Sequence, residues 1–289
     1  MGLNARVAIV TGAGAGLGRT HALELGRHGA KVVVNDLGRG ADEVAAEIVQ
    51  EGGEAFGFQA SVTNESAVGA MVAETISRWG RVDILVNNAG ILRDKSFAKM
   101  SLDDFRLVLE VHLMGTVICT KAVWEQMRQQ AYGRVVMTTS SSGLFGNFGQ
   151  SNYGAAKMGL VGLMQVLSLE GEKYNIRVNS LAPTAATAML EGLVSEERKA
   201  QMAPELVSPG LIKLVGEDAP TRAILCAGSG HFSRSYITLT GGAWVGEPDG
   251  AAESVIDYWD EISDRAREIV PDNGPQQSMQ QIKARSERT

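Results

Sequence analysis

Disulfide chemistry and chain-breaking residues are scarce in this sequence of 289 residues, which has 2 cysteines and 7 prolines. Cys119 and Cys226 both stand in apolar segments of helical character, where cysteine behaves as a small buried hydrophobe. The sequence therefore excludes a disulfide scaffold. With 44% hydrophobic residues, the chain is long enough to bury one large core.

Positive charge is also in short supply, because 27 Lys and Arg face 33 Asp and Glu and leave a net charge of −6. A nucleic acid or an anionic membrane would need a basic face, so neither is expected as a partner. No apolar segment predicts a signal peptide or a membrane-spanning helix. The final residues Ser-Glu-Arg-Thr do not match a peroxisomal tripeptide, and we expect a cytoplasmic protein.

Tyr153 and Lys157 stand four residues apart, a spacing that puts a phenol and an ammonium group on one face of a helix. A fixed positive charge beside a phenol lowers the phenol pKa and makes it a usable acid near neutral pH. The same pair also occurs as a plain surface contact, so a second motif is needed to decide between the two interpretations.

That second motif is a glycine-rich turn near the N-terminus. The apolar run Val7-Ala-Ile-Val10 is followed by Thr11-Gly-Ala-Gly-Ala-Gly-Leu-Gly18 and then by a stretch of helical character. Glycines at 12, 16 and 18 let the backbone approach a pyrophosphate, and the helix presents free N–H groups to it. The spacing matches T-G-x-x-x-G-x-G and does not match G-x-G-x-x-G.

An acidic residue, Asp36, ends a second predicted strand, Lys31-Val-Val-Val-Asn35, about twenty residues beyond the glycines. Its carboxylate is suited to bind the adenosine ribose hydroxyls and would repel a 2′-phosphate. Ala15 supplies no compensating positive charge, so NAD is favoured over NADP. Arg39 is near enough in sequence to meet a phosphate, which keeps NADP as the alternative.

Strand and helix patterns alternate through most of the chain, as in an α/β protein. Together with the strand, glycine turn and helix at the N-terminus, they predict a single-domain Rossmann-type doubly wound parallel sheet with helices on both faces. Composition changes near Asp249, so we predict a domain over 1–248 and a C-terminal extension over 249–289. The extension is predicted to be helical first and then, from Pro271, a polar disordered tail.

With these motifs the chain resembles the classical short-chain dehydrogenase/reductase family from about Ala5 to about Gly246. It also has Asn87-Asn-Ala-Gly90, which in the family closes over the cofactor, and Ser140, thirteen residues before Tyr153. The resemblance implies a catalytic set in which Ser140 hydrogen-bonds the reacting oxygen and Tyr153 passes the proton. In the same set Lys157 holds the nicotinamide ribose and lowers the pKa of the tyrosine.

The resemblance also implies a cofactor site and no metal. The residues expected to contact the dinucleotide are Gly12, Gly16, Leu17, Gly18, Asp36, Leu37, Ser61, Val62, Asn87, Ala89, Gly90, Tyr153, Lys157, Pro183 and Thr187. Ser142 is an alternative to Ser140, because both lie in the polar run Met137-Thr-Thr-Ser-Ser-Ser-Gly143.

Two positions depart from the general family pattern. His112 stands where a helix asparagine more often completes the catalytic set, and Ser61 stands where an aspartate more often meets the adenine. A structural histidine and a proton-relay histidine are both open interpretations of His112. Ser61 can still form a hydrogen bond to the adenine.

Leu37-Gly38, Ile91-Leu-Arg-Asp94 and Gly146-Asn-Phe-Gly-Gln150 narrow the resemblance to the (3R)-hydroxyacyl-CoA dehydrogenase module of multifunctional β-oxidation enzymes. This branch implies an NAD-dependent oxidation of a 3-hydroxyacyl thioester. A dehydrogenase of a free steroid or terpene alcohol is the alternative enzyme, and a non-catalytic dinucleotide-binding sensor is the alternative from another class. Small residues in the helix that carries Tyr153 permit close helix contact, and resembling proteins use this helix to form dimers and tetramers, so we expect a homodimer or homotetramer.

Overall fold

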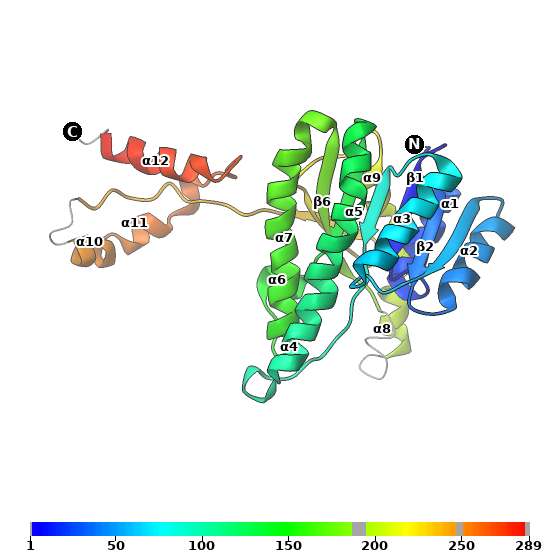
Figure 1. Cartoon of the computed structure of the whole chain (residues 1–289). Coiled ribbons are helices and arrows are strands. Elements are labelled where there is room, and N and C mark those ends of the chain that lie inside the picture. The colour runs from blue at the N-terminus through cyan, green and yellow to red at the C-terminus, as the bar shows by residue number, and fades with distance from the viewer. Residues whose placement is uncertain (1, 187–194, 247–250, 287–289) are drawn as a thin grey trace. The chain divides into compact units, whose positions relative to one another are not determined.

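The computed structural model describes residues 2–186, 195–246 and 251–286. The chain divides into two compact units, Met1–Arg234 and Ser235–Thr289. Figure 1 shows the helices and strands of both. The domain boundary predicted at 248 and 249 lies outside the described residues and stays a prediction.

An eight-stranded sheet forms the centre of the first unit, in the order β3-β2-β1-β4-β5-β6-β7-β8. Its pairs from β3 to β7 are parallel. Central strands such as β1 are buried along their whole length, which explains their continuous apolar sequence. The strands are β1 Val7–Thr11, β2 Lys31–Asp36, β3 Glu54–Gln59, β4 Ile84–Asn87, β5 Gly133–Thr138, β6 Ile176–Thr184, β7 Ile224–Gly228 and β8 His231–Ser235.

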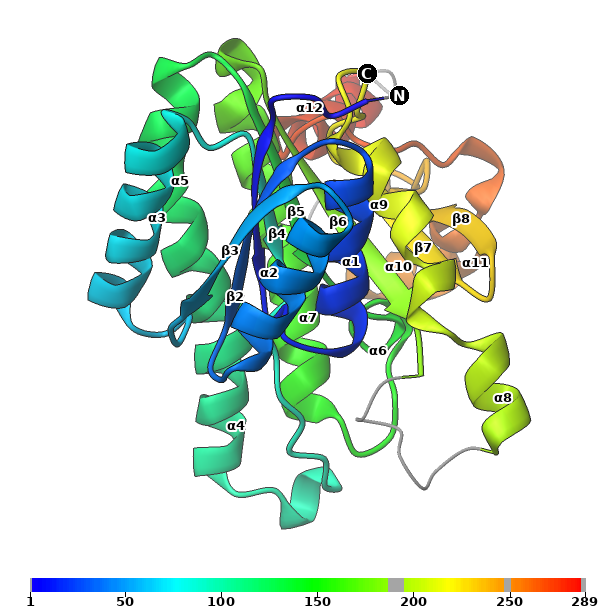
Figure 2. The same ribbon diagram turned by 90° about the vertical axis from the view of Figure 1, so that its right-hand side faces the viewer.

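Helices cover both faces of this sheet, as Figure 2 shows edge-on. One apolar core lies between the sheet and α1, α2 and α9, and a second lies between the sheet and α3, α5 and α7. The doubly wound α/β fold predicted from the sequence is confirmed. The helices are α1 Gly16–Arg27, α2 Gly40–Gln50, α3 Glu65–Trp79, α4 Leu102–Leu109, α5 Gly115–Gln129, α6 Ser141–Phe145, α7 Ser151–Gly171, α8 Glu196–Gln201 and α9 Ser208–Val215.

A π-helical segment, Glu110–Met114, joins α4 to α5, so that Leu102–Gln129 forms one helical run of 28 residues. By length and composition this run is apolar enough to cross a membrane, with a mean hydropathy of 1.4 over its most apolar window. The sequence-based expectation that no segment is long and apolar enough to cross a membrane was therefore wrong. The run contacts α3, α7 and strands β4 and β5, as a core helix of such a sheet does.

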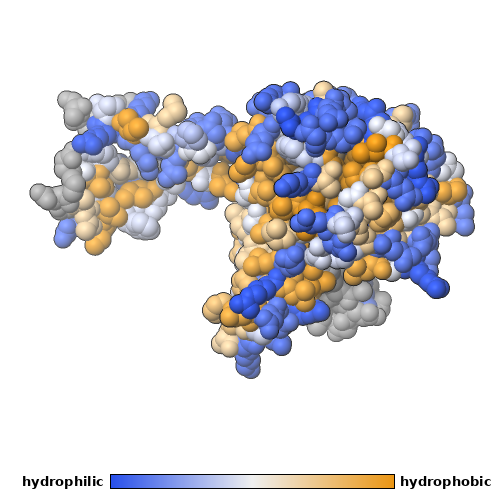
Figure 3. Space-filling view, in the orientation of Figure 1, coloured by the Kyte–Doolittle hydropathy of each residue, from blue (hydrophilic) through white to orange (hydrophobic). Residues whose placement is uncertain are grey.

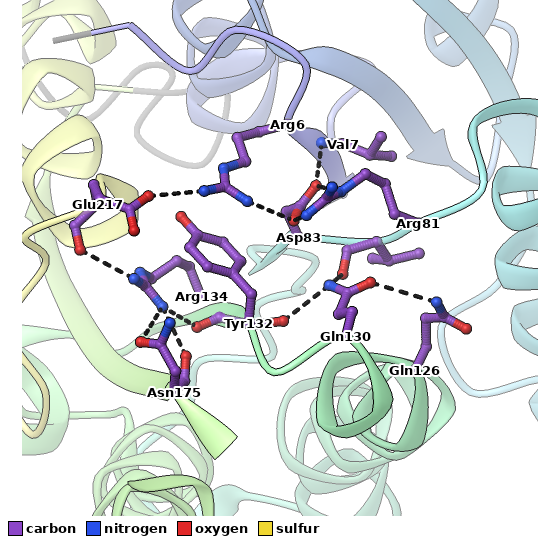
Figure 4. A network of polar contacts seen from close by, with 12 residues as sticks. Arg6, Val7, Arg81, Asp83, Gln126, Gln130, Tyr132, Arg134, Asn175 and Glu217 are labelled. Carbon is purple, nitrogen blue, oxygen red and sulfur yellow. Dashed lines mark hydrogen bonds and ion pairs between the residues drawn. The ribbon is translucent and has the colours of Figure 1, made fainter. Parts of the chain in front are cut away.

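The amino ends of the strands are tied together by a polar network, drawn in Figure 4. Its centre is the carboxylate of Asp83, which is fully buried just before β4. This carboxylate accepts hydrogen bonds from the Val7 backbone N–H at 2.9 Å, from Arg81 Nε at 2.7 Å and from Arg6 Nη1 at 3.3 Å. One carboxylate thus joins the starts of β1 and β4.

A second part of the network stacks two guanidinium groups on the Tyr132 ring. The Arg6 guanidinium lies 3.6 Å from the ring centroid and that of Arg134 lies 4.1 Å from it. Arg134 is fully buried, and it donates to the backbone carbonyls of Gly216 and Glu217, both at 3.0 Å. The buried charge is thereby hydrogen-bonded, and it holds the segment after α9 against β5.

The second unit is built from short helices: α10 Ala251–Asp257, α11 Trp259–Ser263 and α12 Pro275–Ser286. None of the residues described in this unit is buried. The predicted disorder from Pro271 onward was wrong for α12. That helix begins with Pro275 in its first turn, and the Asn273 side chain accepts a hydrogen bond from the Gln276 N–H at 3.2 Å.

We expect Asp83→Asn to lower the free energy of unfolding by roughly 3 kcal/mol, because two guanidinium groups would lose their buried counter-charge. Urea titration followed by circular dichroism measures this loss. Glu51→Gln is the matched control, since it removes the carboxylate of an exposed pair with Arg27 and should leave stability unchanged. Equal effects of the two variants would contradict a structural role for the network.

Candidate active site

A cavity of about 390 Å³ opens where the carboxyl ends of the central strands meet. Gly12 follows β1, Asp36 ends β2, Asn88 follows β4, Thr138 ends β5 and Pro183 lies near the end of β6, and all five line this cavity. β1 and β4 are neighbours in the sheet but not in sequence, so the chain changes direction there. Such a switch point is where open α/β sheets bind their ligands.

The glycine turn after β1 lies on the wall of this cavity. Gly12 has φ of +62°, and a Cβ built on it would come within 2.7 Å of the Ala89 Cα. A Cβ on Gly18 would lie 2.1 Å from the Gly12 carbonyl oxygen. Helix α1 begins after Ala15, which offers no side-chain cap, so its first N–H groups are available to a ligand.

Asp36 is held in a fixed orientation at the same edge. Its Oδ2 accepts from the Gly14 N–H at 2.9 Å and its Oδ1 accepts from the Leu37 N–H at 2.7 Å. Gly14 is not one of the three motif glycines. A Cβ on Gly14 would nevertheless lie 3.0 Å from the Asp36 carboxylate, so this glycine also keeps room for the aspartate.

The turn after β4 differs in one respect from the sequence prediction, which chose Asn87. The Asn87 amide donates to Thr120 Oγ1 at 3.1 Å, and among the described residues Asn88 and not Asn87 lines the cavity. The Asn88 amide donates to the carbonyls of Thr11 and Gly12 at 3.1 and 3.0 Å. The asparagine that faces the glycine turn therefore lies one position further along the chain.

Ser140, Tyr153 and Lys157 are brought together by β5, α6 and α7. The Ser140 side chain acts on the Tyr153 phenol and lowers its pKa, and the Lys157 Nζ lies 5.4 Å from the centroid of the tyrosine ring. Lys157 is buried, and its Nζ donates to the Thr138 carbonyl at 2.5 Å. The four-residue spacing predicted from sequence thus places both groups on the same side of α7.

The turn that begins α6 distinguishes Ser140 from the alternative, Ser142. Ser140 is the N-cap of this helix, and its Oγ accepts from the Ser142 N–H at 3.1 Å. The Ser142 hydroxyl instead donates to Gln150 Oε1 at 2.7 Å. Ser140 is thus the serine that reaches Tyr153.

The electrostatics of the pair differ from the sequence-based expectation. Burial raises the pKa of Tyr153, while its hydrogen bond to Ser140 lowers that pKa and the Asp94 charge raises it. Burial also lowers the pKa of Lys157 to about 7, so its ammonium is only partly charged near neutral pH. In this structure desolvation raises the pKa of the phenol, and the side chain that lowers it is Ser140 rather than the predicted Lys157.

Most of the residues predicted to contact a cofactor line the cavity, namely Gly12, Gly16, Leu17, Gly18, Asp36, Leu37, Ser61, Val62, Ala89, Gly90, Tyr153, Lys157 and Pro183. Thr187 lies outside the described residues. Several lining residues were not in the prediction: Ala15, Asn35, Ala60, Asn88, Ile91, Val111, His112, Thr138 and Ala185. Ala15, Ala60, Asn88 and Ile91 adjoin predicted residues, so adjacency in sequence was the signal that could have found them.

No group of three or more His, Cys, Asp or Glu residues in the described part of the chain is placed to hold a metal ion.

Comparison with known proteins identifies the family. A family model described as short chain dehydrogenase matches residues 6–198. A short-chain type dehydrogenase/reductase of Mycobacterium tuberculosis is 45% identical over 91% of this chain and 96% of that protein. This chain belongs to the short-chain dehydrogenase family. The Ser140, Tyr153 and Lys157 cluster thus lies in an oxidoreductase, and the sensor alternative is not retained.

Two further relatives are informative about the branch. The peroxisomal multifunctional enzyme type 2 of Drosophila melanogaster is 43% identical over 91% of this chain, which spans 46% of that enzyme. Its full-length structure matches with a TM-score of 0.85 at 35% identity, over 100% of this chain and 50% of that one. A 7α-hydroxysteroid dehydrogenase complexed with NADH and a 7-oxo bile acid matches with a TM-score of 0.74 at 30% identity, over 79% of this chain and 95% of that one.

Short-chain dehydrogenases use NAD(P), and the cavity of this family member fits such a dinucleotide. Gly12 and Gly18 leave a cradle that a Cβ would fill, beside the uncapped start of α1, which suits a pyrophosphate. Asp36, Tyr153 and Lys157 line the same cavity as this glycine turn.

We expect Gly18→Ala to weaken NADH binding by at least about tenfold, because the added methyl group would displace the Gly12 carbonyl and the glycine turn. Fluorescence titration with NADH measures the loss. Gly69→Ala is the control, since in the described part of the chain nothing lies within 4 Å of a Cβ at this position of α3. Unchanged NADH binding by Gly18→Ala would show that the turn does not contact the dinucleotide.

Proposed function

We propose that this short-chain dehydrogenase is an NAD-dependent (3R)-hydroxyacyl-CoA dehydrogenase. The observation that carries the chemistry is that Tyr153 and the buried Lys157 line one cavity, where the Ser140 side chain acts on the phenol. The substrate class is supported by the similarity to the Drosophila multifunctional enzyme over 91% of the chain, together with the branch-specific segments in the sequence. Because the chain spans less than half of that enzyme, the proposal concerns the dehydrogenase reaction alone.

In the proposed oxidation, the substrate hydroxyl gives its proton to the Tyr153 phenolate. NAD, when bound, would supply the acceptor for the hydride that the carbinol carbon loses. The Ser140 hydroxyl donates a hydrogen bond to the substrate oxygen as it becomes a carbonyl. Lys157, whose Nζ donates to the Thr138 carbonyl, would hold the coenzyme ribose.

The pKa of Tyr153 sets a pH dependence for this reaction. Since burial raises that pKa, the phenolate is scarce at neutral pH, and oxidation should speed up as the pH rises toward mildly alkaline values. The reverse reduction needs the protonated phenol, so it should persist at neutral pH.

We also propose NAD rather than NADP as the coenzyme. The Asp36 carboxylate is fixed by two backbone N–H groups at the ribose end of the cavity, where it would repel a 2′-phosphate. Ala15 lines the same wall without a positive charge. Arg39, at the N-cap of α2, is the group that would favour NADP instead.

A free steroid alcohol is the second candidate substrate. Its support is the match to the 7α-hydroxysteroid dehydrogenase structure over 79% of this chain. The same catalytic residues would serve both substrates, because only the carbinol group reaches them.

We expect NADH formation at mildly alkaline pH with (3R)-hydroxyacyl-CoA thioesters, and none with (3S)-thioesters or free steroid and terpene alcohols. Tyr153→Phe should lower turnover by at least about a hundredfold and leave NADH binding intact, because only the proton acceptor is removed. Absorbance at the NADH band measures the rates, with NAD and NADP compared in parallel.

Tyr174→Phe is the matched control for this assay, because it removes a half-buried phenol hydroxyl in the turn Glu172–Tyr174 after α7, outside the cavity, and should keep full activity. Turnover of free alcohols alone would overturn the thioester assignment and keep the catalytic residues. Faster reaction with NADP would overturn the coenzyme assignment.

We propose a homo-oligomer built on α5 and α7. Apolar side chains gather over the face formed by α4, α5 and α7, as Figure 3 shows. Exposed large hydrophobic residues on these helices, and on the π-helical segment between α4 and α5, are Leu102, Leu107, Met114, Met158, Val166 and Leu169. An apolar surface of this kind is typical of a subunit interface.

Small-molecule substrates are the expected partners. A cytoplasmic location and the absence of nucleic-acid or membrane partners stay predictions.

We expect light scattering to give two or four times the chain mass of 30.7 kDa. Val166→Glu should shift this mass toward the monomer, since it would bury a charge in the proposed interface on α7. Val49→Glu on α2 is the matched control, because Val49 is exposed to 52% and Val166 to 53%. A monomeric wild-type protein would contradict the proposal.

A further inference from the structure

His112 is a buried side chain to which the proposed reaction assigns no role. It lies in the π-helical segment Glu110–Met114, is 2% exposed, and lines the cavity that holds Tyr153 and Lys157. Its backbone carbonyl accepts a hydrogen bond from Thr116 Oγ1 at 2.8 Å. This carbonyl contact lies within the helical run, so the imidazole ring makes the contacts of His112 to other segments.

One side of the imidazole is held by the backbone of Ile91, twenty-one positions earlier in the chain. Nε2 lies 2.7 Å from the Ile91 carbonyl oxygen and 3.0 Å from the Ile91 nitrogen. A single ring nitrogen cannot both donate and accept in the neutral ring. We assign the proton to Nε2 because its contact with the carbonyl acceptor is the shorter of the two, and in this tautomer Nε2 donates to the Ile91 carbonyl.

In this tautomer Nδ1 carries a lone pair. Nδ1 is buried and finds no hydrogen-bond partner among the residues that the structure describes. Burial first, and then the charge of Lys157, lower the pKa of His112 to about 3, so the ring stays neutral near physiological pH. The Tyr153 phenol is a second titratable group that faces the ring.

The other side of the imidazole supports the Tyr153 ring. The two ring centroids lie 5.1 Å apart with an interplanar angle of 88°, an edge-to-face contact. The imidazole fits there because residue 90 is glycine, since a Cβ on Gly90 would lie 2.1 Å from its Cε1 atom. The ring thus occupies the slot between the turn after β4 and the phenol.

We propose that His112 is a positioning residue that couples the cofactor-facing turn to the proton carrier. Its Nε2–H donates a hydrogen bond to the Ile91 carbonyl, and its ring packs edge-to-face against the Tyr153 ring. One neutral side chain thereby sets the distance between the turn containing Ala89 and Gly90 and the phenol on α7. This inference rests on the proposed function only in giving Tyr153 the proton-transfer role.

Two substitutions separate the two contacts. In His112→Gln the side-chain amide nitrogen can take the place of Nε2 and donate to Ile91, but the ring against Tyr153 is lost. In His112→Phe a ring remains against Tyr153, but the donor to Ile91 is lost. If the phenylalanine variant does not fold, His112→Met replaces it, because Met also lacks a donor and fills irregular space.

We expect His112→Phe to weaken NADH binding by about tenfold, the effect of leaving a buried carbonyl without its donor. We expect His112→Gln to keep NADH binding within about twofold and to lower kcat by about tenfold, through loss of the aligned phenol. In the glutamine variant the rise of kcat with pH should also move to lower pH, because water would reach the phenol, whose pKa burial now raises.

The control is the same pair of substitutions at His21, another fully buried histidine, whose Nδ1 contacts Ser208 Oγ at 2.8 Å. His21→Gln and His21→Phe should lower the melting temperature without changing NADH binding, kcat or the pH profile. His112 variants that behave like the His21 variants would overturn the inference. NADH titration needs no substrate, so unchanged binding by His112→Phe refutes the Ile91 contact even if the substrate assignment also fails.

Discussion

The contact between two backbone turns is the constraint on which the rest of the site depends. The glycine turn after β1 and the Asn87-Asn-Ala-Gly90 turn after β4 pass so close that a Cβ on Gly12 would lie 2.7 Å from the Ala89 backbone. Asn88 joins them by donating to two carbonyls of the first turn. Because β1 and β4 are adjacent in the sheet, this contact forms at the switch point and shapes the coenzyme side of the cavity.

Helix α7 supplies two titratable side chains to the same cavity. Its Tyr153 and Lys157 are both buried enough for desolvation to control their pKa values, upward for the phenol and down to about 7 for the ammonium. The two shifts act together, because each disfavours the charged form of its group in a dry site. A bound dinucleotide and substrate would bring new hydrogen bonds and charges to both groups. These contacts would stabilise the phenolate and the ammonium.

The two ends of the sheet divide the tasks of stability and chemistry. At the amino ends, Asp83 accepts hydrogen bonds from a backbone N–H and two guanidinium groups, and Arg134 donates to backbone carbonyls. At the carboxyl ends, the polar groups remain available to a ligand around the cavity. The buried charges at the amino ends thus secure the strands whose carboxyl ends carry the site.

The sequence by itself determined the strand and helix order, the glycine turn, and the shared face of Tyr153 and Lys157, because these depend on spacing along one chain segment. The choice of Asn88 over Asn87 was decided by which asparagine meets the glycine turn, a contact between segments about seventy-seven residues apart. Likewise, only the tertiary structure joined His112 to Ile91 and Tyr153, gathered Asp83 with Arg6, and reversed the expected direction of the Tyr153 pKa shift. The physical reason is that periodicity along the chain assigns a side chain to a face, whereas burial and desolvation depend on everything that packs against that face.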